Sequence, residues 1–170
     1  MLLVIGVDPG TKNQGIALRL PQGLDRAHTR SLNVTSPREI RALLASVRSD
    51  YPDATIIVAI EEWTVAARGE KTTWNVIQKL ERIGERWSTV ADLIGLQVER
   101  INSKAWQKAY RIRSRKPKAK LLPGEANPTT KEQSVQAVRT VFGITATEDL
   151  ADAILIADYI FSLRKFTHGR

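Results

Sequence analysis

The sequence of 170 residues has no cysteine and only two histidines, His28 and His168. Because proteins hold zinc mainly through thiolate and imidazole groups, a zinc site is not expected, and a disulfide is excluded. The lack of cysteine also fits a reducing compartment. No apolar run approaches the roughly 18 residues that a membrane-spanning helix needs, and the start of the chain lacks the pattern of a secretion signal. We therefore expect a cytoplasmic protein with no membrane partner.

Acidic residues are outnumbered by basic ones: 18 Asp and Glu stand against 26 Lys and Arg, which gives a formal net charge of +8. Such a surface attracts polyanions, because Lys and Arg release the counterions condensed on phosphates. The charge concentrates at residues 112–128, which we interpret as a mobile basic loop within a single domain spanning residues 1–170. Candidate DNA-binding residues in and beside this loop are Arg111, Arg113, Arg115, Lys116 and Lys118.

Two acidic residues follow apolar runs that are typical of buried strands. Residues 2–7 lead into Asp8, and residues 55–60 lead into Glu61. Successive side chains of a strand point to opposite faces, so Glu61 and its neighbour Glu62 cannot both face Asp8. A carboxylate therefore ends each of two predicted strands.

Two further acids, Asp149 and Asp152, stand at the start of a predicted C-terminal helix. They are three residues apart and so share a helix face. Glu148 is an alternative to Asp149, since the helix dipole favours any acid in a first turn. Buried, converging carboxylates need a compensating charge, and Mg²⁺ prefers such oxygen ligands. Two ions roughly 3.5–4 Å apart can activate water and stabilise the leaving oxygen of a phosphodiester, which indicates a metal-dependent nuclease.

Hydrophobic periodicity predicts an α/β fold. Strands are expected near residues 2–8, 14–20, 26–34, 55–61 and 96–101, the first three as a meander. Helices are expected at residues 37–50 and 73–93, after a cap at Ser103, after a capping box at residues 129–132, and from about Thr147.

Three short motifs resemble those of the RuvC family of Holliday junction resolvases in order and spacing. They are Gly6-Val7-Asp8-Pro9-Gly10-Thr11, Ala59-Ile60-Glu61 and Asp149-Leu150-Ala151-Asp152-Ala153. The resemblance spans nearly the whole chain and implies an RNase H-like fold, with a mixed five-stranded sheet flanked by helices. It implies that Asp8, Glu61, Asp149 and Asp152 bind Mg²⁺ or Mn²⁺, with two ions per active site. Lys131 resembles a catalytic basic position near the metals, and either Lys104 or Lys108 would be a second.

Further DNA contacts are expected around the strand that ends at Glu61. The family has an aromatic residue three positions after this glutamate, whereas here Thr64 stands there and Trp63 one position earlier. Stacking of a base on an aromatic ring is worth about 1–3 kcal/mol. Candidate DNA-binding residues outside the basic loop are Lys12, Trp63, Arg68, Lys71, Trp74, Lys104 and Lys108.

The resemblance implies a structure-selective endodeoxyribonuclease that resolves four-way DNA junctions in a bacterium or a phage-infected cell. Two symmetric cuts favour a homodimer, with the helix at residues 73–93 as a candidate interface. A YqgF-like RNA-processing nuclease is an alternative, because residues 8–12 and 15–18 also resemble its opening. An actin-like phosphotransferase is disfavoured, because that fold normally needs two domains and a chain of 170 residues is too short for both. A basic junction-binding protein without metal chemistry is the non-enzymatic alternative.

Overall fold

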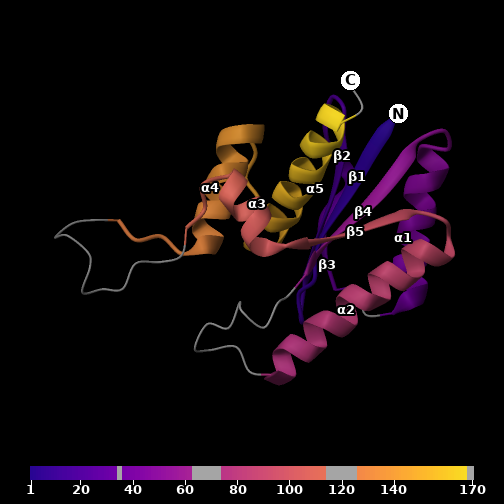
Figure 1. Ribbon diagram of the computed structural model, residues 1–170, viewed down its shortest axis with the longest axis horizontal. Helices are drawn as coiled ribbons and strands as arrows, with labels where there is room; N and C mark the ends of the chain where they lie inside the picture. Colours follow the sequence, from indigo (N-terminus) through magenta and orange to yellow (C-terminus); the bar gives the residue numbers. More distant parts are fainter. Residues whose placement is uncertain (34–35, 63–73, 114–125, 168–170) are drawn as a thin grey trace.

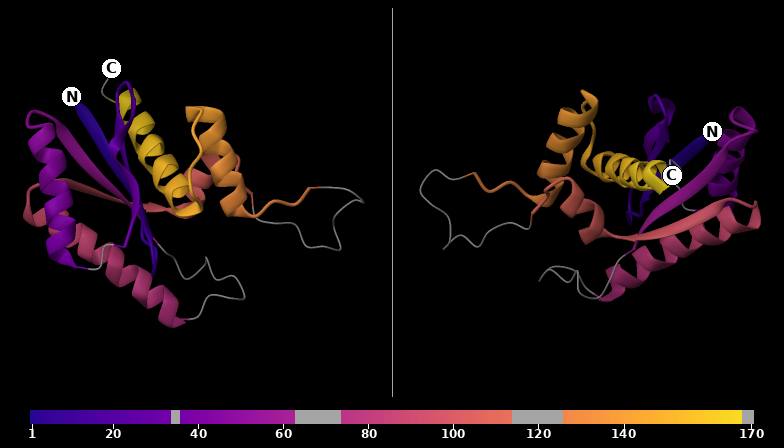
Figure 2. Two further views of the ribbon diagram at one scale, coloured as in Figure 1. Left: turned by 180° about the vertical axis from the view of Figure 1, so that it is seen from behind. Right: turned by 45° about the horizontal axis from the view of Figure 1, so that its top comes forward.

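The computed structural model describes residues 1–33, 36–62, 74–113 and 126–167. Within these residues, a five-stranded sheet lies between two groups of helices (Figures 1 and 2). The strands are β1 (Leu2–Asp8), β2 (Gln14–Leu20), β3 (Gly23–Leu32), β4 (Thr55–Glu62) and β5 (Gln97–Asn102). The helices are α1 (Pro37–Asp50), α2 (Trp74–Leu93), α3 (Ser103–Ala109), α4 (Thr130–Phe142) and α5 (Glu148–Thr167). The predicted α/β class is confirmed.

The sheet is mixed, and its strand order is β3-β2-β1-β4-β5. The first three strands form the expected antiparallel meander, whereas β1, β4 and β5 are parallel. Val7 is paired with Ile60 in the β1–β4 register. Asp8 and Glu61 are the next residues along these two strands, so the register itself brings the two carboxylates to the same edge of the sheet.

Each face of the sheet supports its own hydrophobic core. Ile5 and Val7 of β1 face a core that includes α1 and α2, whereas Val4 faces a core that includes α5. On β4, Ile57 and Ala59 share the α5 face. Since side chains alternate along a strand, Asp8 and Glu61 continue the two rows that face α5. Both acids therefore point toward the helix that contains the other two.

Helix α5 packs directly on the backbone of the sheet at two glycines that lie beneath it. A Cβ atom at Gly6 would stand 2.2 Å from the carbonyl oxygen of Ala153, and one at Gly15 would stand 1.9 Å from that of Asp149. Either contact is too short for a side chain to exist there. The absence of side chains at these positions allows the first turns of α5, with Asp149 and Asp152, to lie against β1 and β2.

Some predicted boundaries are wrong by a few residues. Strand β3 begins at Gly23, not at residue 26, because Leu20 pairs with Gly23 across a tight turn; polar residues at the start of the strand hide its alternation. Asn102 caps α3 in place of Ser103: the Asn102 side chain accepts a hydrogen bond from the backbone N–H of Lys104. The capping box at Thr129 and Glu132 is confirmed. In the described part of the chain, no helix has the length and apolar character to cross a membrane.

Candidate active site

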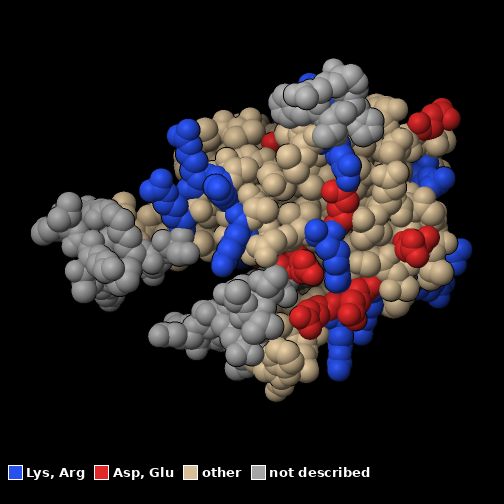
Figure 3. Space-filling view, viewed as in Figure 1, with Lys and Arg blue, Asp and Glu red and all other residues tan. Residues whose placement is uncertain are grey.

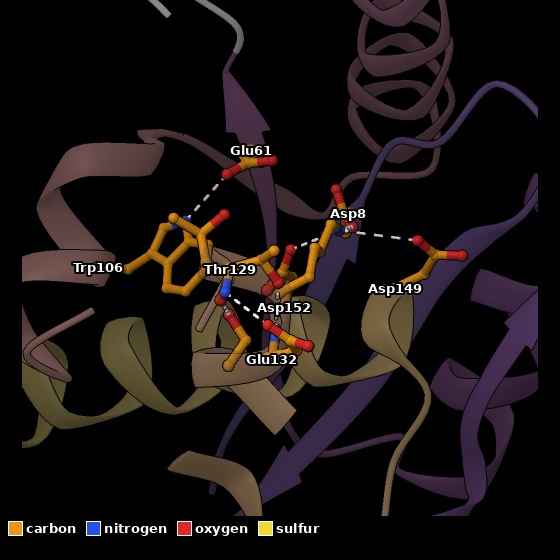
Figure 4. Close-up of polar contacts among 10 residues, drawn as sticks. Asp8, Glu61, Trp106, Thr129, Glu132, Asp149 and Asp152 are labelled. Carbon is orange, nitrogen blue, oxygen red and sulfur yellow. Dashed lines mark hydrogen bonds and ion pairs between the residues drawn. The ribbon is translucent and has the colours of Figure 1, made fainter. Parts of the chain in front are cut away.

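Three buried carboxylates meet where β1, β4 and α5 converge (Figure 4). Asp8 is 3% exposed, Glu61 is 5% exposed and Asp152 is 6% exposed. Asp149, one turn before Asp152, lies at the rim with its side chain 38% exposed. The structure thus brings together the four acids singled out in the sequence, and Glu148 stays exposed.

The ammonium group of Lys131 lies among these acids. Its Nζ is 2.6 Å from Asp152 Oδ2, 3.2 Å from Asp8 Oδ2 and 3.7 Å from Asp149 Oδ1. Lys131 is the second residue of α4, whose start is fixed by the reciprocal hydrogen bonds between Thr129 and Glu132. The capping box therefore determines where the lysine enters the site.

Burial dominates the electrostatics of the site. It raises the pKa of Asp8 to about 6: attraction to Lys131 opposes this shift, and repulsion from Asp152 adds to it. Burial also raises the pKa of Glu61 well above its usual range, with repulsion from Asp8 and Asp152 acting in the same direction. For Lys131, burial lowers the pKa, but the attraction of Asp8 and Asp152 outweighs it and the net shift is upward. A single cation thus compensates several acids only in part.

The oxygen atoms of the site suit a hard cation. Among the described residues, Oδ1 of Asp152 is a buried oxygen that accepts no hydrogen bond. Within the described segments, no three acidic or histidine side chains are arranged so that they could hold a metal ion as they stand. The Lys131 ammonium is the positive group among the acids. A divalent ion and Lys131 would compete for the same carboxylates, all of which are oxygen donors of the kind that Mg²⁺ and Mn²⁺ accept.

Glu61 and Glu62 differ in exposure, as strand alternation predicts, although both border one hollow beside α2. Glu61 is buried and accepts a hydrogen bond from the indole N–H of Trp106, at 3.1 Å. Glu62 is exposed and lines a hollow that also includes Glu81 and Glu85 of α2. This contact joins residues that are 45 positions apart, so the sequence gives no sign of it.

Four of the predicted DNA-binding residues surround one hollow at the end of α3. Lys104, Lys108, Arg111 and Arg113 line this hollow, whose volume is about 330 Å³. Figure 3 shows the Lys and Arg side chains gathered in this region. Lys104 and Lys108 are both exposed beside this hollow, and which of them is the second basic position of the site stays a prediction.

Gln133 of α4 connects two segments that flank the basic stretch, a structural role that its position in the sequence does not indicate. Its side-chain amide donates to the carbonyl oxygens of Arg113, at 2.9 Å, and Pro128, at 3.0 Å. Its Oε1 accepts from the backbone N–H of Arg113, at 2.9 Å. Gln133 thus holds the described ends of the basic stretch against the start of α4, the helix that contains Lys131.

The remaining DNA-binding candidates fall into two groups. Lys12 is exposed in the β1–β2 turn, and Trp74 is 50% exposed at the start of α2. The others lie outside the described residues: Trp63, Arg68, Lys71, Arg115, Lys116 and Lys118.

Solved structures provide a comparison for this arrangement. The structure of T. thermophilus RuvC in complex with a Holliday junction substrate is similar with a TM-score of 0.65 and 18% sequence identity, over 98% of both chains. A Thermus thermophilus RuvC structure gives a TM-score of 0.63 and 20% identity, over 97% of both chains. This chain has the RuvC fold. The RNase H-like RuvC fold predicted from the motifs is confirmed, although no protein-family model and no curated protein matches the sequence.

Proposed function

We propose that this chain is a divalent-metal-dependent endonuclease that resolves four-way DNA junctions. The supporting observation is that Asp8, Glu61 and Asp152, from three elements distant in sequence, are buried together beside Lys131 in a RuvC fold. Burial of several carboxylates in one place is costly for folding and is typical of a site that binds cations. We further propose that residues 1–170 act as one nuclease domain.

The four acids would hold Mg²⁺ or Mn²⁺, as two ions per site. When bound, such ions lower the pKa of water and stabilise the charge that develops on phosphodiester oxygens. Asp8, Glu61 and Asp152 supply buried oxygens, and Asp149 supplies a more exposed one at the rim. Lys131, with its ammonium already within the site, is positioned to neutralise negative charge on the phosphate under attack.

DNA is the polyanion that fits this surface. The net charge of +8 and the basic hollow at the end of α3 favour phosphate contacts, which position a nucleic acid without reading its sequence. The similar T. thermophilus RuvC structure contains a Holliday junction substrate. Selection of four-way junctions would therefore come from their shape and from the spacing of their phosphates.

Separation of a four-way junction into two duplexes requires two symmetric cuts, so we propose a twofold-symmetric homodimer. Helix α2 is the candidate interface because it exposes three large apolar residues, Trp74 (50%), Val76 (37%) and Leu93 (79%). A mass measurement in the presence of junction DNA tests this part of the proposal: a monomer bound to the junction would contradict it.

The proposal is tested with labelled four-way, three-way, duplex and single-stranded DNA, and with an RNA:DNA hybrid, each with and without Mg²⁺ or Mn²⁺. We expect cleavage of the four-way junction only with the metal. Glu61→Gln should abolish cleavage, whereas Glu62→Gln, its exposed neighbour on the opposite strand face, should leave cleavage close to wild type. Equal effects of the two substitutions, or preferred cleavage of the hybrid, would contradict the proposal.

A further inference from the structure

A second basic hollow lies between the β1–β2 turn and α2, apart from the acids. Its volume is about 240 Å³, and its lining includes Thr11, Lys12, Asn33, Lys79, Arg82 and Arg86. Among the described residues that line it, four are Lys or Arg and none is Asp or Glu. Like charges around one hollow repel one another, and an anion between Lys12, Lys79 and Arg82 would reduce that repulsion.

The charges of α2 are sorted by helix face, and the basic face lines this hollow. Lys79, Arg82 and Arg86 follow one another at intervals of three and four, so they share the face that looks toward the β1–β2 turn. Glu81 and Glu85 are four apart and line a different hollow, together with Glu61 and Glu62. Figure 3 shows acidic side chains gathered over α2. A merely solvated helix would mix the two signs around its circumference.

We propose that the hollow between the β1–β2 turn and α2 binds a backbone phosphate of DNA. This inference rests on the proposed function and adds a contact to it. Lys79 and Arg82 would neutralise the phosphate, and Lys12 would approach it from the opposite wall. The Thr11 hydroxyl and the Asn33 amide add neutral hydrogen-bond donors, so the lining combines charge with directional contacts.

The hollow lies within reach of a strand that passes the acids. Lys12 is four residues after Asp8, and four residues span at most about 13–14 Å. A DNA strand has one phosphate per roughly 3.4 Å of helix axis. A phosphate in the hollow would thus be only a few nucleotides from the one at the acids, so it would set the register of the cut.

The test compares two double substitutions that remove the same charge. Lys79→Ala with Arg82→Ala alters the hollow, and Arg38→Ala with Arg41→Ala removes two exposed arginines from α1 as the matched control. Binding to a four-way junction is measured in EDTA at several salt concentrations. Since each lost phosphate contact lowers the slope of log K against log salt by about 0.9, we expect a slope smaller by about 1 for the α2 pair and little change for the α1 pair.

Two results would overturn the inference: equal weakening by both pairs, or no weakening by the α2 pair, including the case in which the α2 pair loses tight binding of pyrophosphate alone. That case would assign the hollow to a small anion. These results are distinguishable from failure of the proposed function, in which the folded wild-type protein would neither bind nor cut branched DNA. Circular dichroism and thermal unfolding establish that both double variants are folded.

Discussion

The indole N–H of Trp106 donates a hydrogen bond to Oε1 of Glu61 across 3.1 Å, and both side chains are buried. The contact connects α3, which packs on the same face of the sheet as α5, to the end of β4. A donor to the charged form of a carboxylate favours its ionisation, and this hydrogen bond acts against the large upward shift in the pKa of Glu61. Trp106 therefore orients one of the proposed metal-binding acids and keeps it closer to ionisation.

Trp106→Phe should keep the aromatic packing but remove this donor. We expect the metal concentration for half-maximal cleavage to rise about tenfold or more, as found when outer partners of metal ligands are lost. The pH dependence of cleavage should also move upward, because Glu61 loses a group that lowers its pKa. Cleavage assays over metal concentration and pH measure both effects.

Trp87→Phe is the matched control for this substitution. Trp87 is equally buried, and its indole N–H donates to Gln14 at 2.6 Å, on the opposite face of the sheet. It should cost stability without changing the metal requirement of cleavage. If both variants shifted the metal requirement equally, Trp106 would have only a structural role.

Gly15→Ala should separate α5 from the sheet. The added Cβ would stand 1.9 Å from the backbone carbonyl oxygen of Asp149, which cannot move without the helix. We expect a loss of about 2–4 kcal/mol in the free energy of unfolding and reduced cleavage even where the protein is folded. Gly84→Ala in α2 is the control: its Cβ meets a flexible arginine end at 3.0 Å, and alanine favours a helix. Urea unfolding compares them, and equal losses would contradict the close-packing explanation.

Lys131→Met should show how much the uncompensated acids destabilise the folded protein. Without its ammonium, the carboxylates are uncompensated, so the metal-free protein should lose about 1–2 kcal/mol of stability, a value reduced for a side chain that is 36% exposed. Added Mg²⁺ should stabilise the variant more than the wild type, because lysine no longer competes for the acids. Thermal unfolding with and without Mg²⁺ measures this, with the exposed Lys104→Met as control. Identical stabilisation of all three proteins by Mg²⁺ would refute the competition.

The raised pKa of Asp8 predicts a pH dependence with a definite sign. Because the folded-state pKa, about 6, lies above the unfolded value, the contribution of this group to stability is fully present below about pH 4 and is lost as the pH rises through about 6. In EDTA, wild type should therefore lose stability over this window relative to Asp8→Asn. Protons compete with metal, so Mg²⁺ affinity should rise from pH 5 to pH 7. Parallel stability profiles of the two proteins would contradict the shifted pKa.

The sequence was sufficient for features that depend on local periodicity. The apolar runs before Asp8 and Glu61 identified two strand ends, and alternation correctly separated Glu61 from Glu62. The three-residue spacing correctly placed Asp149 and Asp152 on one face of α5. The fold followed from these motifs together, because their order matches a known arrangement.

Features that depend on tertiary contacts were not visible in the sequence. Nothing local indicates that Trp106 donates to Glu61, or that Gln133 joins Arg113 to Pro128, because each contact connects separate elements. The spacing of Lys79, Arg82 and Arg86 is consistent with a basic face on α2. This face is not evident along the sequence, because acidic residues stand between these positions.

The most direct test of the central claim is the rate at which Asp8→Asn cuts a labelled four-way junction in Mg²⁺, with junction binding measured on the same samples. If buried acids create the metal-dependent nuclease, cleavage should fall by at least about a thousandfold while binding is retained or strengthened, because a repulsive charge is removed. A folded Asp8→Asn protein that cuts the junction at the wild-type rate would contradict the account.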